Sequence, residues 1–265
     1  MKKLMIAAVA SIAAVGAFAV ESANVVGYQN VNGAASQKAM IGATFQKIAG
    51  TGMTLGDVGI NESFVELSDT LTLLNEYGGA AGVYVYMTKT TATDFGFTEG
   101  WYDNEEISTW DGESPLINKN SVELYDGEAM MLQVSSSDAA LVFAGAVPDE
   151  AVELECAAGQ KTFLSNCTPV DRSLGDLTVN ATFVELSDTL TILNEFGGAA
   201  GVYVYMSATT AADFGLEAGW YDNEEISTWD GESPLLPQVV ALPAGKGFML
   251  QVADDGAAVI VPAAL

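Results

Sequence analysis

A gapless internal duplication constrains this chain more than any other feature. The string GWYDNEEISTWDGESPL stands at residues 100–116 and again, letter for letter, at residues 219–235. Residues 61–116 align with residues 180–235 without a gap, and most of the aligned positions are identical. Equivalent residues such as Trp101 and Trp220 lie 119 positions apart, a period far above the roughly 20–50 residues of a solenoid or propeller unit. The duplicated unit is therefore predicted to be a whole domain.

Weaker similarity continues on both sides of this block. The string LGD precedes it in both copies, and GEAMMLQV from Gly127 matches GKGFMLQV from Gly245 after a shift of one residue. We therefore predict two tandem homologous domains, at residues 24–148 and 149–265. The connection AVPDEAVE around Pro148 is short, so the domains are expected to pack together or to hold a limited range of orientations.

The N-terminus has the pattern of a secretory signal peptide. The string MKKLMIAAVASIAAVGAFA combines two lysines, an apolar run, and small residues at Ala17 and Ala19 where a signal peptidase cuts. Residues 1–19 are predicted to be removed, which leaves an exported protein that is extracellular, periplasmic or held at the cell surface. Nothing later in the sequence approaches the roughly 18 continuous apolar residues of a membrane span. No transmembrane span is expected in the mature chain.

The only two cysteines are Cys156 and Cys167. In an exported chain two cysteines most simply pair, so we expect a disulfide between them. A zinc site is disfavoured, because the sequence contains no histidine to complete it.

The charge balance restricts the partners. Nine lysines and arginines stand against 35 aspartates and glutamates, a net charge of −26. A chain this acidic repels the phosphate backbone, so nucleic acid is excluded as a partner. Cations, basic proteins and neutral polysaccharides remain, and a polysaccharide or a surface protein is the expected partner.

Short strands dominate the local patterns. TLTLL from Thr70 and VYVYM from Val83 are rich in β-branched or aromatic residues and alternate along the chain, and turn formers separate them. We predict an all-β fold, with a sandwich or barrel-like structure in each domain. A short helix through FVELSDTLTLLNEY is the alternative, since Phe64, Leu67 and Leu71 lie near helical spacing. Threonine content and flanking glycines favour strands.

Several short elements resemble a group of exported bacterial tandem β-repeat proteins of uncharacterised function. In that group a segment like ANVVGYQNV starts the mature chain, and each repeat carries L-[GS]-D, Y-x-Y, G-W-Y-D and a terminal G-x-G-F-x-[LV] element. The corresponding residues here are 23–31, Leu55–Asp57, 84–86, Gly100–Asp103 and, in the second copy, 245–250.

This resemblance covers most of the mature chain and implies a secreted β-repeat protein, with no activity attached. The first copy departs from the terminal element, because Glu128 and Ala129 stand where the second copy has Lys246 and Gly247.

The repeated string gathers carboxylates that suit calcium. If WYDNEEI is extended, Asp103 and Glu105 project to one face, and further acids follow near a turn at Gly112. Calcium takes six to eight such oxygen ligands. The string lacks the D-x-[DN]-x-[DN]-G spacing of an EF-hand, however, and a solvated acidic hairpin is the leading interpretation. The candidate calcium ligands are Asp103, Glu105, Asp111 and Glu113, with their copies Asp222, Glu224, Asp230 and Glu232.

The same string carries two tryptophans per copy. Because tryptophan buries a large area, we expect Trp101 and Trp220 in the cores of the two repeats. Trp110 and Trp229 are candidate ligand-binding residues, whose faces would stack on sugar rings.

Catalysis has little support in the sequence. Without histidine there is no Ser-His-Asp triad and no Cys-His pair, and we assign no catalytic residue. A pair of carboxylates can hydrolyse a glycosidic bond. Each copy would then need its own cleft in a domain of ordinary size.

Together these features favour an exported, acidic tandem β-repeat protein that is a structural or interaction module at or outside the cell surface. In this interpretation the repeated string is mainly framework. The alternative is a carbohydrate-binding protein with one site per repeat, supported by calcium or without it. A carboxylate glycosidase comes third.

Overall fold

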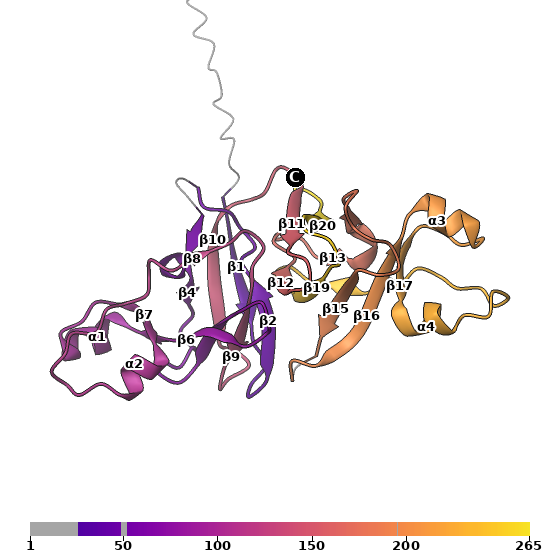
Figure 1. Cartoon of the computed structure of the whole chain (residues 1–265). Coiled ribbons are helices and arrows are strands. Elements are labelled where there is room, and N and C mark those ends of the chain that lie inside the picture. The colour runs from indigo at the N-terminus through magenta and orange to yellow at the C-terminus, as the bar shows by residue number, and fades with distance from the viewer. Residues whose placement is uncertain (1–25, 49–51, 195) are drawn as a thin grey trace, which may run out of the picture.

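The computed structural model describes residues 26–48, 52–194 and 196–265 (Figure 1). Strands dominate this part of the chain, the pairings between them are antiparallel, and the helices are few and short. The all-β prediction is confirmed. The predicted signal peptide lies outside the described residues. None of the helices in the described ranges is long and apolar enough to cross a membrane.

The first repeat follows a regular order of short strands with helices inserted after β6 and β7. Its elements are β1 (Val26–Asn32), β2 (Lys38–Gly42), β3 (Met53–Thr54), the 3-10 helix η1 (Leu55–Asp57), β4 (Gly59–Ile60), β5 (Thr70–Leu74), β6 (Ala80–Met87), α1 (Lys89–Phe95), β7 (Gly100–Asp103), α2 (Asn104–Ser108), β8 (Glu123–Leu124), β9 (Ala129–Gln133) and β10 (Ala140–Ala146).

The second repeat has the same order of elements. They are β11 (Val152–Cys156), β12 (Lys161–Ser165), β13 (Arg172–Ser173), the 3-10 helix η2 (Leu174–Asp176), β14 (Thr178–Val179), β15 (Thr189–Leu193), β16 (Ala199–Met206), α3 (Ala208–Asp213), β17 (Gly219–Asp222), α4 (Asn223–Thr228), β18 (Ala241–Leu242), β19 (Gly247–Gln251) and β20 (Ala257–Val261).

Both repeats build the same sheets. A five-stranded sheet has the order β2-β9-β5-β6-β7 in the first repeat and β12-β19-β15-β16-β17 in the second. A three-stranded sheet has the order β1-β10-β4 or β11-β20-β14, and a two-stranded ribbon joins β3 to β8 or β13 to β18. The sequence duplication is thus reproduced in the strand topology.

A buried carboxylate decides where β5 begins. Asp69 is 2% exposed, and its two oxygens accept the backbone N–H groups of Val65 and Ser135 at 2.8 Å. These bonds close a turn in which Leu67 has a left-handed φ of 58°, a conformation that no α-helix contains. The helix considered for this segment is therefore wrong, and Thr70 starts a strand that pairs with β6 and β9.

Each repeat has a hydrophobic core of its own, with a tryptophan at its centre. The side chain of Trp101 is fully buried, its Nε1–H donates to the carbonyl of Val58 at 2.9 Å, and its ring meets those of Phe64 and Tyr86 edge to face. Trp220 is equally buried in the second core. The expectation for these two tryptophans is confirmed.

Two equivalent backbone hydrogen bonds join the repeats, in addition to one from the N–H of Lys161 to the carbonyl of Glu76 at 3.0 Å. The N–H of Gly42 donates to the carbonyl of Gly245 at 2.9 Å, and the N–H of Ser165 donates to the carbonyl of Gly127 at 2.8 Å. In the alignment of the repeats Gly42 corresponds to Ser165 and Gly127 to Gly245. The contact is therefore symmetric about an approximate two-fold axis, like the isologous interface of a dimer. Figure 1 shows the two halves side by side.

Apolar side chains fill the space between these hydrogen bonds. Met40, Ala129 and Leu193 are buried together, and Phe163 packs against them from the second repeat. The backbones approach so closely that a Cβ atom at Gly247 would lie 2.7 Å from Cβ of Met40. Glycine at this position is what lets β19 rest against β2.

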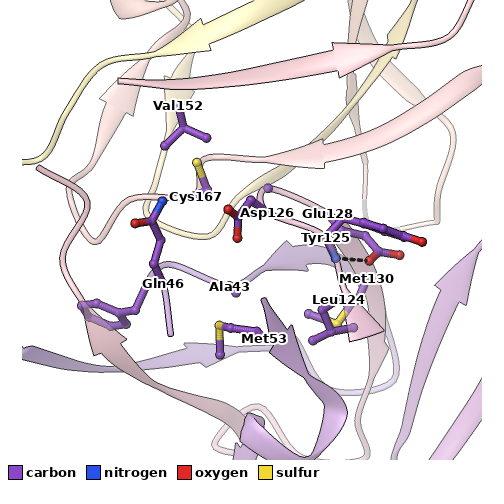
Figure 2. Close-up of a pocket in the computed structure, with 12 residues that line it drawn as sticks. Ala43, Gln46, Met53, Leu124, Tyr125, Asp126, Glu128, Met130, Val152 and Cys167 are labelled. Carbon is purple, nitrogen blue, oxygen red and sulfur yellow. Dashed lines mark hydrogen bonds between the residues drawn. The ribbon is translucent and has the colours of Figure 1, made fainter. Parts of the chain in front are cut away.

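The expected disulfide is absent, and strand geometry explains why. The thiol of Cys156 lies 2.9 Å from Oγ1 of Thr162, at the start of β12, whereas Cys167 follows the end of that strand. Five residues of nearly extended chain span about 16 Å, far more than the roughly 7 Å between Cα atoms that a disulfide tolerates. Cys167 instead faces a small pocket beside Val152 (Figure 2). Both cysteines are free and buried.

Thiol titration checks this correction. Burial raises the pKa of Cys167 to about 12 and also raises the pKa of Cys156, so neither thiol should react quickly in the native protein. We expect an aromatic disulfide reagent to detect two thiols per chain in denaturant without reductant, and much slower reaction in buffer. Detection of almost no thiols in denaturant would show that the two cysteines form a disulfide after all.

Removal of a core tryptophan tests the two-core description. Trp101→Ala, or Trp220→Ala, deletes a fully buried indole and a hydrogen bond. The free energy of unfolding is expected to fall by about 3–5 kcal/mol in either case, measured by urea denaturation. Trp110→Ala, which removes a half-buried ring, is the control and should cost clearly less. Equal losses in all three variants would contradict the assignment of the cores.

Candidate functional site

The repeated string forms a strand followed by a helix, not an extended hairpin. Strand β7 ends at Asp103, whose Oδ1 accepts the backbone N–H groups of Glu105 at 2.9 Å and Glu106 at 3.2 Å. An aspartate in this position caps a helix, and acidic residues in the first turn favour its dipole. The condition of an extended WYDNEEI segment is not met, because capping by Asp103 stops the strand. Asp222 does the same at α4.

The second half of the string is a tight acidic turn. Oδ1 of Asp111 accepts the N–H groups of Ser114 at 3.0 Å and Glu113 at 2.9 Å, around Gly112 with a φ of 82°. Hydrogen bonds from the backbone of Ser114 and Glu113 hold the pKa of Asp111 below its usual range. The copy of this turn at Asp230 has the same bonds and the same direction of shift.

The candidate calcium ligands are thus dispersed between a helix cap and a turn. One carboxylate oxygen of Asp103 and one of Asp111 accept hydrogen bonds from backbone N–H groups. Glu105 and Glu113 are exposed. Across the ranges that the structure describes, no three acidic, cysteine or histidine side chains are grouped so that they can hold a metal ion. Calcium binding by the repeated string stays a prediction.

The side chains of Trp110 and Trp229 make local structural contacts. Nε1–H of Trp110 donates to the carbonyl of Ser114 at 2.6 Å, and its ring lies edge to face with Phe95 at 5.7 Å between centroids. Trp229 repeats both contacts, with Ser233 and Phe214. The indoles are half-buried, which leaves part of each ring at the surface. Stacking on sugars also stays a prediction.

The early end of β7 leaves a hollow in each repeat. The hollow of the first repeat lies between the beginning of β6 and helix α2 and measures about 370 Å³, and that of the second measures about 410 Å³. Their linings match residue for residue. They consist of residues 80–83, 103–105 and 108 in the first repeat and residues 199–202, 222–224 and 227 in the second.

An open strand edge forms one wall of each hollow. The pairing of β6 with β7 covers residues 84–87, so among the described strands residues 80–83 pair with β5 alone. The surface end of the strand carries only small residues, namely Ala80, Ala81 and Gly82. The exposed backbone can hydrogen-bond to an extended chain, and the carboxylates of Asp103 and Glu105 border it.

Sequence reasoning selected the acids of this hollow but missed the hollow itself. The duplicated carboxylates drew attention to Asp103 and Glu105, whereas the open edge of β6 follows from a register that no local pattern encodes. The available signal was a long strand pattern, AAGVYVYM, followed by the short GWYD before an aspartate that can cap a helix.

Comparison with models of protein families, with curated proteins and with solved structures found no match.

Calcium titration tests the dispersed arrangement of the acids. Because no group of three candidate ligands converges in the described residues, millimolar calcium is expected to leave the melting temperature unchanged within about 1 °C, and a chelator should do the same. Magnesium at equal ionic strength is the control. A calcium-specific rise in melting temperature that disappears in Asp103→Asn would show that the carboxylates gather around the ion.

Proposed function

We propose that this chain is an exported, acidic interaction module that acts at or outside the cell surface and binds a partner twice, once through each repeat. Each repeat folds as a domain, at residues 24–148 and 149–265, around its own core. Support for two domains comes from the core residues, because one cluster draws on the first repeat alone and another on the second alone.

The duplicated hollow carries this proposal. Each hollow combines an open strand edge, small side chains that allow close approach, and carboxylates at its border. An open edge invites an added strand, and proteins use this mode to bind extended segments of their partners. Structural edges are commonly blunted by a charge, a proline or a β-bulge. Residues 80–83 and 199–202 carry no charge and no proline, but their register with β5 or β15 shifts.

Duplication has a physical advantage for such a binder. Two equivalent sites on one chain raise the apparent affinity for a partner that presents its segment repeatedly, by a factor of roughly 10²–10⁴ when both sites engage. The symmetric contact between the repeats fixes the distance between the hollows. A surface protein or a polymer with a regular spacing fits this arrangement.

Carbohydrate binding is the second candidate, and one observation favours it. The pairs Phe95 with Trp110 and Phe214 with Trp229 form equivalent aromatic surfaces, and both phenylalanines are 49% exposed. A glycosidase that uses the acids of the repeated turns has less support, because one carboxyl of its catalytic pair needs a raised pKa. In the repeated turns the pKa values of Asp111 and Asp230 are lowered instead.

Retention of the mature chain on bacterial envelope material tests the proposal. We expect binding to an envelope fraction and loss of binding after that fraction is treated with protease. Ser108→Trp fills the first hollow, and combined with Ser227→Trp it should weaken retention at least about a hundredfold, since avidity is lost. Thr109→Trp with Thr228→Trp is the matched control and should bind normally.

Two other results would contradict it. Retention on a pure insoluble polysaccharide that falls in Trp110→Ala with Trp229→Ala would support the carbohydrate-binding alternative. Retention that is equal in the hollow-filling and control variants would show that the open edges do not bind the partner.

A further inference from the structure

The contact between the repeats creates two grooves related by the same approximate two-fold axis. In one groove the backbone of Glu128 forms an isolated antiparallel β-bridge with Leu164. In the other groove Lys246 forms the same kind of bridge with Ile41. The first groove lies along β11 and the turn before β9 and measures about 380 Å³. The second lies along β1 and the turn before β19, with a similar volume. The backbone that forms them is equivalent, so any difference between them resides in the side chains.

The two grooves differ sharply in charge. Glu76 lines the first groove, and its counterpart Glu195 lies outside the described residues. Four further acids line it, of which strand β11 contributes Glu153 and Glu155 and the turn before β9 contributes Asp126 and Glu128. Strand pairing aligns Leu154 with Val31, since they oppose the equivalent residues Val259 and Leu141. At the positions of the four acids the second groove therefore has, in the same order, Asn30, Asn32, Ala244 and Lys246.

One of these acids has a structural contact, since Oε1 of Glu153 accepts the side-chain N–H of Asn180 at 2.8 Å. The backbone that the two grooves share does not require the other acids. The second groove has the same backbone, yet among its described lining residues Lys246 alone is charged. The ion pairs in the described part of the chain join Lys47 to Asp57 and Lys119 to Glu106, away from the first groove. Its carboxylates thus stand without a cationic partner, although Lys161 also lines it.

Glu128 is the least solvated of these acids. Its Oε2 accepts the backbone N–H of Tyr125 at 3.0 Å (Figure 2). Burial raises the pKa of its carboxyl in spite of that bond. Lys246, its counterpart, directs its ammonium towards the carbonyl of Leu193 at 3.5 Å. An acid that is partly buried without a counter-charge is costly unless a ligand supplies one.

The groove also offers the contacts that an extended peptide needs. Among the described strands β11 pairs with β20 alone, so its other edge is open. Its exposed positions, Glu153 and Glu155, alternate with the buried Leu154. The ring of Tyr125 is 76% exposed at the rim, and Phe163 forms part of the wall. Aromatic faces next to carboxylates favour the ammonium or guanidinium groups of such a peptide.

We propose that this acidic groove between the repeats binds an extended segment of a partner protein that carries lysine or arginine side chains. The volume lies within the range of roughly 300–1,000 Å³ typical of ligand sites. The segment would add to the open edge of β11 and place its cationic groups between Glu153 and Glu155 on one side and Glu128 on the other. This site is distinct from the duplicated hollows and does not depend on their function.

A peptide that alternates lysine and threonine over seven residues, labelled with a fluorophore, is the probe. We expect the mature chain to bind it by fluorescence anisotropy, with affinity that falls as salt rises. The same peptide with acetylated lysines should not bind. Glu128→Lys copies the residue of the second groove, so the fold tolerates it, and it should weaken binding at least about tenfold through like-charge repulsion. Glu153→Asn with Glu155→Asn should act in the same direction.

Controls separate this groove from the general negative charge of the protein. Glu232→Lys makes the same change of charge on the exposed acidic turn of the second repeat and should leave the affinity within about twofold. Equal losses in Glu128→Lys and Glu232→Lys, or no binding of the lysine peptide, would overturn the proposal. Binding of spermidine as tight as that of the peptide would overturn the peptide as occupant. Unchanged melting temperatures show that each variant is folded.

Discussion

Two backbone hydrogen bonds between the repeats set the arrangement of the whole molecule. The bond from Gly42 to Gly245 and the bond from Ser165 to Gly127 are the same contact seen from each repeat. Backbone groups make them, so they persist although the side chains of the two repeats have diverged. They bring the five-stranded sheets together over a shared apolar cluster and create the two grooves on either side of it. The two repeats thus meet through equivalent surfaces within one chain.

A second constraint acts within each repeat, where an aspartate stops a strand. Capping of α2 by Asp103 ends β7 after four residues, while its neighbour β6 continues for eight. The difference in length opens the hollow, and Asp222 produces the same result in the second repeat. One local hydrogen-bonding preference therefore creates a surface feature twice. Structural contacts thus account for Asp103, Asp111 and Trp110 of the repeated string.

The two repeats have been kept alike in one place and have diverged in another. The hollows have identical linings, which fits a shared partner, whereas the inter-repeat grooves differ at the positions of Asp126, Glu128, Glu153 and Glu155. In a homodimer both grooves would be identical by symmetry. Fusion of the two copies into one chain allows Glu128 and Lys246 to differ and permits one groove to specialise.

Local sequence patterns predicted the strands, the duplication and the buried tryptophans Trp101 and Trp220, because side-chain alternation and size act over a few residues. They failed where contacts between residues far apart in the sequence determine the structure. Pairing of the cysteines looked natural from composition, but β12 holds Cys156 and Cys167 apart. The WYDNEEI segment is not extended, because Asp103 caps a helix within it. The open edge of β6 depends on the register of β6 with β7. The sequence by itself determined an all-β chain built from two copies of one unit. Only the tertiary structure decided which strand edges stay open and which acids face a groove, since both follow from contacts between residues far apart in the chain.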